Sequence, residues 1–152
     1  MKFALASDHA GFDLKDHLFR TLTARGLDCA DFGSAAGVKA DYVDTAEQAL
    51  LSVQSGARDR AILVCGTGMG MSIVANKFRG IRGTLCWNDY TALMSRQHND
   101  SNCLCLGGRV LTPEEGLRLT DIWLATAFEA ERHLRRLDKI RVLEERHFKP
   151  LS

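Results

Sequence analysis

Short apolar runs alternate with amphipathic segments along nearly the whole chain, and this alternation constrains the fold more than any other feature. Short apolar runs bounded by glycine or polar residues are typical of buried strands, whereas the longer segments between them carry the period of amphipathic helices. This order predicts an α/β fold: a Rossmann-like, doubly wound sheet of about five parallel strands with helices on both faces and a protruding C-terminal helix. The expected strands are 3–6, 27–32, 61–65, 84–87 and 103–106, and the expected helices are 11–25, 44–55, 70–78, 89–98, 113–126 and 129–147.

The length and the charge balance narrow the class of protein. With 152 residues and neither linker nor repeat, the chain is expected to form one domain over residues 1–152. Its 20 Lys and Arg against 19 Asp and Glu give no general attraction to nucleic acid or to an anionic membrane. No apolar run reaches the roughly 20 residues of a membrane helix, and the N-terminal run turns polar too soon for a signal peptide. Five cysteines, an odd number, predict reduced thiols and a cytoplasmic protein.

Parallel sheets of this kind bind ligands at the carboxyl ends of their strands. Functional residues are therefore expected directly after the first, third and fifth strands, in residues 7–11, 65–70 and 107–109. The first of these segments places Asp8 beside His9, and both side chains could point into a crevice. A helix cap formed by Asp8, with His9 facing solvent, is the simpler alternative.

The segment Cys65-Gly-Thr-Gly-Met-Gly-Met-Ser72 is the sharpest local signal. Three glycines in five positions allow several backbone N–H groups to face one point at the start of a helix, which favours an anion and the thiolate form of Cys65. Cys65 is thus a candidate base or nucleophile. The segment lacks the Lys of a Walker A loop, the Arg of a phosphatase cysteine loop and the spacing of a dinucleotide-binding loop. A tight turn with a buried, inert cysteine stays open as the alternative.

For the polar segments outside these loops, a purely structural role is an alternative to a functional one. Residues 96–100 end a helix, so their polar groups could simply cap its C-terminus. Arg132 and Arg136 lie four residues apart on one helix face, where they could hold one phosphate or belong to a solvated or dimer-packing surface. Cys103 and Cys105 share one face of a strand with no second ligand pair, so we expect core packing and no metal site.

Together these motifs resemble the ribose-5-phosphate isomerase type B family, whose relatives include the galactose-6-phosphate isomerase subunits. The resemblance runs from residue 2 to about 147. It implies interconversion of an aldose phosphate and a ketose phosphate through a cis-enediolate, without a metal or an organic cofactor. It rests on residues 7–11, 41–42, 65–70, 75–77, 80–82, 95–100, 107–110 and 132–136.

By position, the resemblance gives Cys65 the role of the base that moves a proton between C1 and C2 of the sugar. The resemblance also implies that the enediolate oxygens are stabilised by Gly66, Thr67, Gly68, Met69 and Gly70. It implies that His98 opens the sugar ring with Asn99, and that Asp8 and Tyr42 bind sugar hydroxyls. The phosphate is expected to be bound by His9, Arg109, Arg132 and Arg136.

The sequence departs from the family pattern at two places. Val43 stands where Pro usually follows the Asp-Tyr pair, which predicts a less rigid 33–44 loop and leaves the chain length of the substrate open. Glu129 and Glu131 replace the more usual glycines before Arg132 and place carboxylates beside the expected phosphate site.

The last expected helix carries an apolar stripe that would be exposed in a monomer, formed by Leu134, Leu137, Ile140 and Leu143. The resemblance places this helix across a partner subunit, so we expect a homodimer or a dimer of dimers in which Arg132 and Arg136 reach the neighbour's phosphate site. No nucleic-acid or membrane partner is expected. The alternatives are an isomerase of a tetrulose, allose or galactose phosphate, a phosphotransfer or anion-binding module phosphorylated at Cys65, and an inactive binding homologue.

Overall fold

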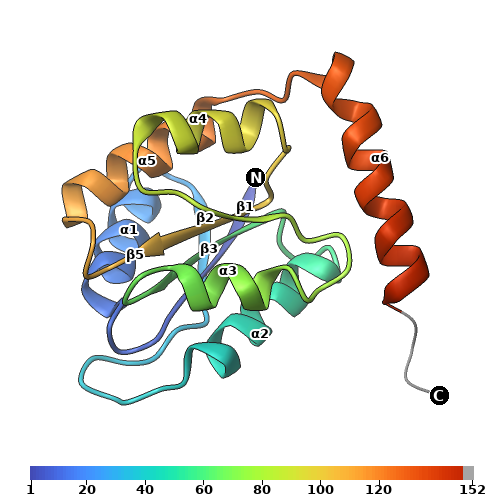
Figure 1. Cartoon of the computed structure of the whole chain (residues 1–152). Helices are drawn as coiled ribbons and strands as arrows, with labels where there is room; N and C mark the ends of the chain where they lie inside the picture. The colour runs from blue at the N-terminus through green and yellow to red at the C-terminus, as the bar shows by residue number, and fades with distance from the viewer. Residues whose placement is uncertain (149–152) are drawn as a thin grey trace.

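The computed structural model describes residues 1–148, which form one five-stranded parallel sheet flanked by helices (Figure 1). The sheet order is β2-β1-β3-β5-β4, so the chain winds in opposite directions from the central pair β1 and β3. The predicted α/β fold is confirmed. The strands are β1 (Lys2–Ser7), β2 (Asp28–Asp31), β3 (Arg60–Cys65), β4 (Gly83–Leu85) and β5 (Cys103–Gly107), and the helices are α1 (Phe12–Ala24), α2 (Tyr42–Gln54), α3 (Met69–Ala75), α4 (Asp89–Gln97), α5 (Pro113–Ala125) and α6 (Ala130–His147).

The sheet separates two apolar layers. In β1, Phe3 and Leu5 face the layer formed with α1, α4 and α5, while Ala4 and Ala6 face the layer formed with α2 and α3. Figure 1 shows the same division of the helices between the two faces. Because both faces are covered, the central strands are apolar at successive positions instead of alternating.

Capping groups in the sequence decide where two of the helices begin. At α5, Thr112 Oγ1 accepts the Glu115 N–H at 3.2 Å, and the Glu115 carboxylate accepts the Thr112 N–H at 2.8 Å, so the helix begins as predicted. At α2, Asp41 Oδ1 accepts the Val43 N–H at 2.9 Å, and the helix begins at Tyr42, before the predicted residue 44. This bond uses the N–H of Val43, which a proline at this position would lack, whereas the lower rigidity expected for the 33–44 loop stays a prediction.

The edge strand β4 is shorter than the predicted strand 84–87. At its first residue, the Asn76 side chain binds both backbone groups of Gly83: Nδ2 donates to the carbonyl at 2.8 Å, and Oδ1 accepts the N–H at 3.1 Å. Asn76 thus makes the contacts that a neighbouring strand would make. The same residue caps the C-terminus of α3, which ends earlier than the predicted residue 78.

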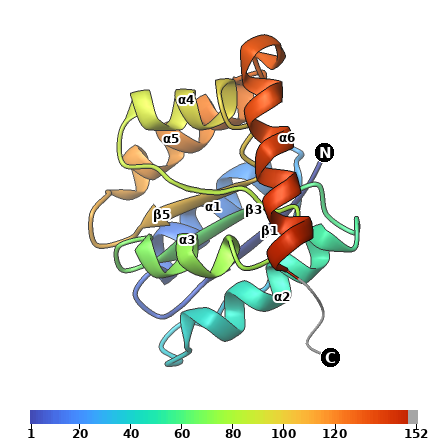
Figure 2. The ribbon, with the colours of Figure 1, turned by 45° about the vertical axis from the view of Figure 1, so that its right-hand side comes forward.

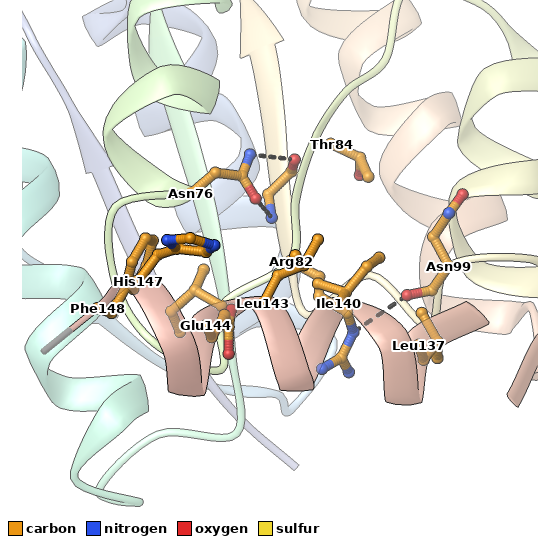
Figure 3. A pocket seen from close by; sticks show the side chains of 12 residues that line it. Asn76, Arg82, Thr84, Asn99, Leu137, Ile140, Leu143, Glu144, His147 and Phe148 are labelled. Atoms are coloured by element: carbon orange, nitrogen blue, oxygen red, sulfur yellow. Dashed lines mark hydrogen bonds between the residues drawn. The ribbon is translucent and has the colours of Figure 1, made fainter. Parts of the chain in front are cut away.

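The helix α6 projects from the main body, as Figures 1 and 2 show. Its apolar residues Leu134 and Leu143 are 50% and 53% exposed, and Ile140 is exposed beside them, so most of the predicted stripe lies open in this single chain. Between α6 and the edge strand β4 lies a groove of about 420 Å³ whose walls include Leu137, Ile140 and Leu143 (Figure 3). Over residues 1–148, no helix has the length and apolar character needed to cross a membrane.

Candidate active site

Cys65 ends β3 at the carboxyl edge of the sheet and is 5% exposed. Its Sγ accepts the backbone N–H of Gly68 at 3.2 Å. The backbone N–H thus faces the sulfur, which is the atom that would accept a proton if Cys65 acts as a base. The structure therefore turns the Cys65 side chain back into the glycine loop that follows it.

The glycines at positions 68 and 70 are needed for this loop to close. Gly68 has φ +78°, and a Cβ there would lie 2.5 Å from Leu85 and 2.9 Å from the Leu106 backbone. A Cβ at Gly70 would lie 2.7 Å from the Tyr42 ring, so Tyr42 packs directly on the loop. Tyr42 thus reaches the glycine loop from the start of α2, and its predicted binding of sugar hydroxyls stays a prediction.

The loop after β5 supports the glycine loop from the other side. Gly108 donates its N–H to the carbonyl of Cys65 at 2.8 Å, and Arg109 donates its N–H to the carbonyl of Gly66 at 2.9 Å. The Arg109 side chain lies beside Gly66, where an added Cβ would be 3.5 Å from its Cδ. Arg109 and Cys65 therefore belong to one site, and Arg109 is exposed there.

The loop after β1 completes this edge. Asp8 is buried, and its Oδ1 accepts the N–H groups of Ala10 and Gly11, both at 2.9 Å, which closes the turn before α1. The N-cap of α1 is Gly11, without a side-chain cap, so the alternative of a helix cap formed by Asp8 is wrong. His9 is exposed, with Nδ1 3.4 Å from the carbonyl oxygen of Ala40. The loops after β1, β3 and β5 converge, as predicted: a Cβ on Gly108 would lie 2.9 Å from the carbonyl oxygen of Ala10.

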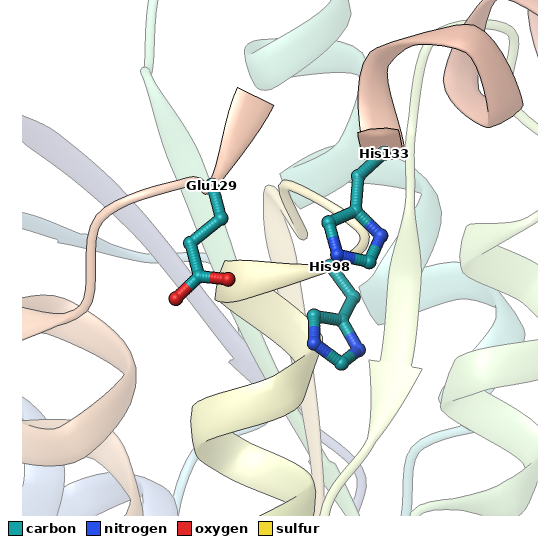
Figure 4. Close-up of side chains that lie close together, drawn as sticks. All are labelled: His98, Glu129 and His133. Carbon is teal, nitrogen blue, oxygen red and sulfur yellow. The ribbon is translucent and has the colours of Figure 1, made fainter. Parts of the chain in front are cut away.

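A second group of polar side chains gathers around the end of α4. The His98 ring stacks on the ring of His133, with 4.2 Å between ring centroids and 16° between planes (Figure 4). Arg132 Nε donates to His133 Nε2 at 3.2 Å, and Arg136 Nη1 lies 3.4 Å from His133 Nδ1. Burial of the His133 imidazole, and then the nearby His98, Arg132 and Arg136, lower its pKa.

The segment that carries His98 and Asn99 is held by partly buried ion pairs of Asp100. Arg96 Nη1 donates to Asp100 Oδ1 at 2.8 Å and to the carbonyl of Ser101 at 2.5 Å, and Arg82 Nη2 donates to Asp100 Oδ2 at 2.9 Å. Arg82 Nε also donates to the carbonyl of Asn99 at 3.1 Å. Arg96 and Asp100 are therefore structural residues that hold the chain after α4, but their side chains bind each other and groups outside α4 and not the carbonyls of its last turn, as capping would require.

The first group lies at the carboxyl ends of the parallel strands (the carboxyl edge), and the second lies at their amino ends (the amino edge). Cys65 pairs with Gly107 at the carboxyl end of β5, whereas residues 98–102 lead into its amino end at Cys103. Four residue steps along β5 separate these ends, about 13 Å at the usual rise per residue. The structure thus brings together Asp8, His9, Tyr42, Cys65, Gly66, Thr67, Gly68, Met69, Gly70 and Arg109 at the carboxyl edge, and separately His98, Asn99, Arg132 and Arg136 at the amino edge.

Sequence reasoning missed one grouping at the amino edge. The ligand atoms of His98, Glu129 and His133 all lie within 4.8 Å of one another, although no His, Cys and carboxylate set with ligand spacing was expected. From the sequence, Glu129 is only a departure from the glycines that the resemblance implies, and His133 has no assigned role. These residues come together because the last turn of α4 meets the start of α6, and this contact can be recognised only once the three-dimensional fold is known.

The parallel sheet and the loop-borne thiol are those of a Rossmann-like α/β enzyme. A family model described as Ribose/Galactose Isomerase matches residues 3–140. The chain belongs to the ribose/galactose isomerase family, and it is an isomerase of that family.

Individual relatives agree over almost the full chain. It is 43% identical to "Ribose-5-phosphate isomerase B" of Escherichia coli over 95% of this chain and 97% of that one. It is 35% identical to "D-erythrulose-4-phosphate isomerase" of Pectobacterium atrosepticum, over 92% and 93%. The solved structure of Clostridium thermocellum Ribose-5-Phosphate Isomerase B superposes with a TM-score of 0.94 at 43% identity, over 97% and 99%. The resemblance stated from sequence is confirmed.

Proposed function

We propose that this enzyme interconverts ribose 5-phosphate and ribulose 5-phosphate, with the Cys65 thiolate as the base. The observation that carries the proposal is the buried Cys65 sulfur, which accepts the Gly68 N–H at 3.2 Å in a loop of backbone donors. The names of the relatives from Escherichia coli and Clostridium thermocellum support the five-carbon substrate.

The chemistry needs one base and one set of donors. The Cys65 thiolate takes the proton from C2 of the open-chain aldose, and the resulting cis-enediolate places negative charge on O1 and O2. Backbone N–H groups of Gly66 to Gly70 and the exposed Thr67 hydroxyl stabilise these oxygens. The Cys65 thiol then returns the proton to C1, while one proton moves from O2 to O1, so ketose forms without net gain or loss of protons. We assign no metal or organic cofactor to this sequence of steps.

We further propose that the site is shared between two copies of the chain. Cys65 and His98 lie at opposite edges of one sheet, so one chain cannot present both to one sugar. A twofold interface would bring the amino edge of one copy to the carboxyl edge of the other and would create two equal sites. In each site the partner's His98 opens the sugar ring with the partner's Asn99, and the partner's Arg132 and Arg136 join Arg109 and His9 on the phosphate.

The exposed apolar stripe on α6 supports this arrangement. Leu134, Ile140 and Leu143 would leave water when a second copy packs on the helix that carries the two arginines. All five cysteines are free, which is consistent with a reducing compartment, and we place the enzyme in the cytoplasm.

A second substrate has a specific observation in its favour, because a relative 35% identical is named D-erythrulose-4-phosphate isomerase. A coupled assay over four-, five- and six-carbon aldose phosphates tests both candidates. We expect the highest kcat/KM with ribose 5-phosphate. A higher kcat/KM with a tetrose or hexose phosphate would replace the proposed substrate, and turnover of none of them would reject the reaction.

A further inference from the structure

Three ligand-type side chains converge at the amino edge of the sheet. A ring nitrogen of His98, a ring nitrogen of His133 and a carboxylate oxygen of Glu129 all lie within 4.8 Å of one another. Figure 4 shows the Glu129 carboxylate turned toward the two stacked rings. The three residues come from the end of α4, the segment before α6 and the first turns of α6.

Backbone contacts bring the segments of this cluster together; His133 is buried, His98 is half-buried and the Glu129 side chain is exposed. His98 donates its N–H to the carbonyl of Met94 at 2.9 Å, and Glu129 donates its N–H to the carbonyl of Gln97 at 3.0 Å, which ties the two chain segments together. His133 is 3% exposed and stacks on His98. Glu129 supplies the only carboxylate of the cluster, from the segment just before α6.

Two imidazoles and one carboxylate are a ligand set that suits Zn²⁺ and its neighbours among the transition metals. Zinc–nitrogen bonds of about 2.0–2.1 Å place two donors of one ion about 3.3 Å apart. The atoms of the cluster would have to approach by an ångström or more, mainly through rotation of the rings of His98 and His133. Such an approach leaves a further coordination position open to water.

The neighbouring cations oppose a metal ion and must be weighed. Arg132 donates to His133 Nε2, which shows that this nitrogen offers a lone pair, and Arg136 makes a longer contact of 3.4 Å with the other ring nitrogen. A metal bound to His133 would replace one of these contacts. Both arginine side chains are exposed and can turn into water, and the charge of Glu129 offsets part of the added positive charge.

We propose that His98, Glu129 and His133 bind a divalent transition-metal ion, for which Zn²⁺ is the probe, through ligands that do not include Cys65. Because the ion would occupy His98, it would inhibit the isomerase, and this second part rests on the role proposed for His98. Binding itself does not depend on the reaction, so the two parts can fail separately.

Zinc binding by the full-length protein, measured by equilibrium dialysis after removal of metal, tests the site. Glu129→Gln removes a ligand and one charge, and Glu131→Gln is the matched control because it removes the same charge two residues away. We expect one Zn²⁺ per chain, weakened at least about tenfold by Glu129→Gln, since even partners outside the ligand shell contribute that much. Equal binding by wild type and Glu129→Gln, or no binding by wild type, would overturn the site.

Cys65→Ala and a cobalt probe distinguish this cluster from a thiolate site. We expect Cys65→Ala to retain zinc binding and bound Co²⁺ to show visible bands without the near-ultraviolet band of a thiolate ligand. Loss of binding in Cys65→Ala, or a thiolate band, would assign the ion to Cys65 and reject the proposal. If zinc binds at the cluster and turnover does not fall, only the proposed inhibition through His98 is rejected. If zinc inhibits the wild-type enzyme and EDTA reverses the inhibition, the proposed inhibition is supported.

Discussion

The two edges of the sheet hold their functional groups by different means. At the carboxyl edge, backbone groups do the work: Gly68 donates to Cys65, and the loop at Gly108 and Arg109 binds the carbonyls beside it. At the amino edge, side chains do the work, with His98 on His133 and an ion-pair network around Asp100. A backbone-built site depends on turn geometry, whereas a side-chain-built site depends on charge and packing, so the two should respond differently to substitution.

The largest effect is expected at the carboxyl edge. Cys65→Ala should lower kcat by about 10²–10⁴-fold, because a methyl group cannot accept the sugar proton. Substrate binding should change much less, which a separate measurement of ligand affinity would show. Cys29→Ala, which alters a half-buried thiol on β2 far from the loop, is the control and should keep wild-type turnover. Retention of more than about a tenth of the turnover in Cys65→Ala would remove Cys65 from the role of base.

Mixing two inactive variants tests whether one active site takes its two edges from two different chains. Cys65→Ala damages one edge and Arg136→Ala the other, so a mixed dimer of a shared-site enzyme has one intact site. Random mixing after refolding should therefore restore about a quarter of the wild-type activity. Mixed dimers that stay inactive, or a wild-type monomer that is fully active in sedimentation, would show that each chain carries its own site.

A change of charge should act on stability at the amino edge. Asp100→Asn keeps the shape of a side chain at φ +43° but removes the partner of Arg96, which is almost fully buried. Because Asp100 itself is partly exposed, we expect a loss of about 2 kcal/mol in the free energy of unfolding, and a Tm lower by about 4–8 °C. The exposed pair of Asp121 with Arg25 is the control, and Asp121→Asn should cost less than about 1 kcal/mol in a urea titration. Equal losses of unfolding free energy in both variants would mean that the ion pairs of Asp100 stabilise the protein no more than an exposed pair does.

The smallest effect is expected from chelators. The proposed proton transfer uses a thiolate and N–H donors of the chain, so EDTA should leave turnover unchanged, or raise it if the preparation carries an inhibiting metal ion. A coupled assay before and after dialysis against EDTA measures this. Loss of activity that a divalent metal restores would contradict the proposed chemistry at the carboxyl edge.

The sequence predicted the features that depend on local pattern. Apolar runs and glycine turns marked the five strands and the loops that converge at Cys65, because strand burial and parallel winding follow from chain order. The ends of α2 and β4 were misplaced, since they depend on side-chain bonds of Asp41 and Asn76 that no periodicity reveals. The cluster of His98, Glu129 and His133 was missed because it joins segments that are distant in sequence.

The bonds between Asn76 and Gly83 have a consequence for how copies of this protein can join. An open sheet edge offers free N–H and C=O groups on which another chain can add a strand, and this is a common route to aggregation. Here a side-chain amide already occupies both backbone groups at the start of β4. Strand addition is blocked at that residue, so a second copy that approaches this side of the sheet meets side-chain surfaces such as that of α6 in place of free backbone groups.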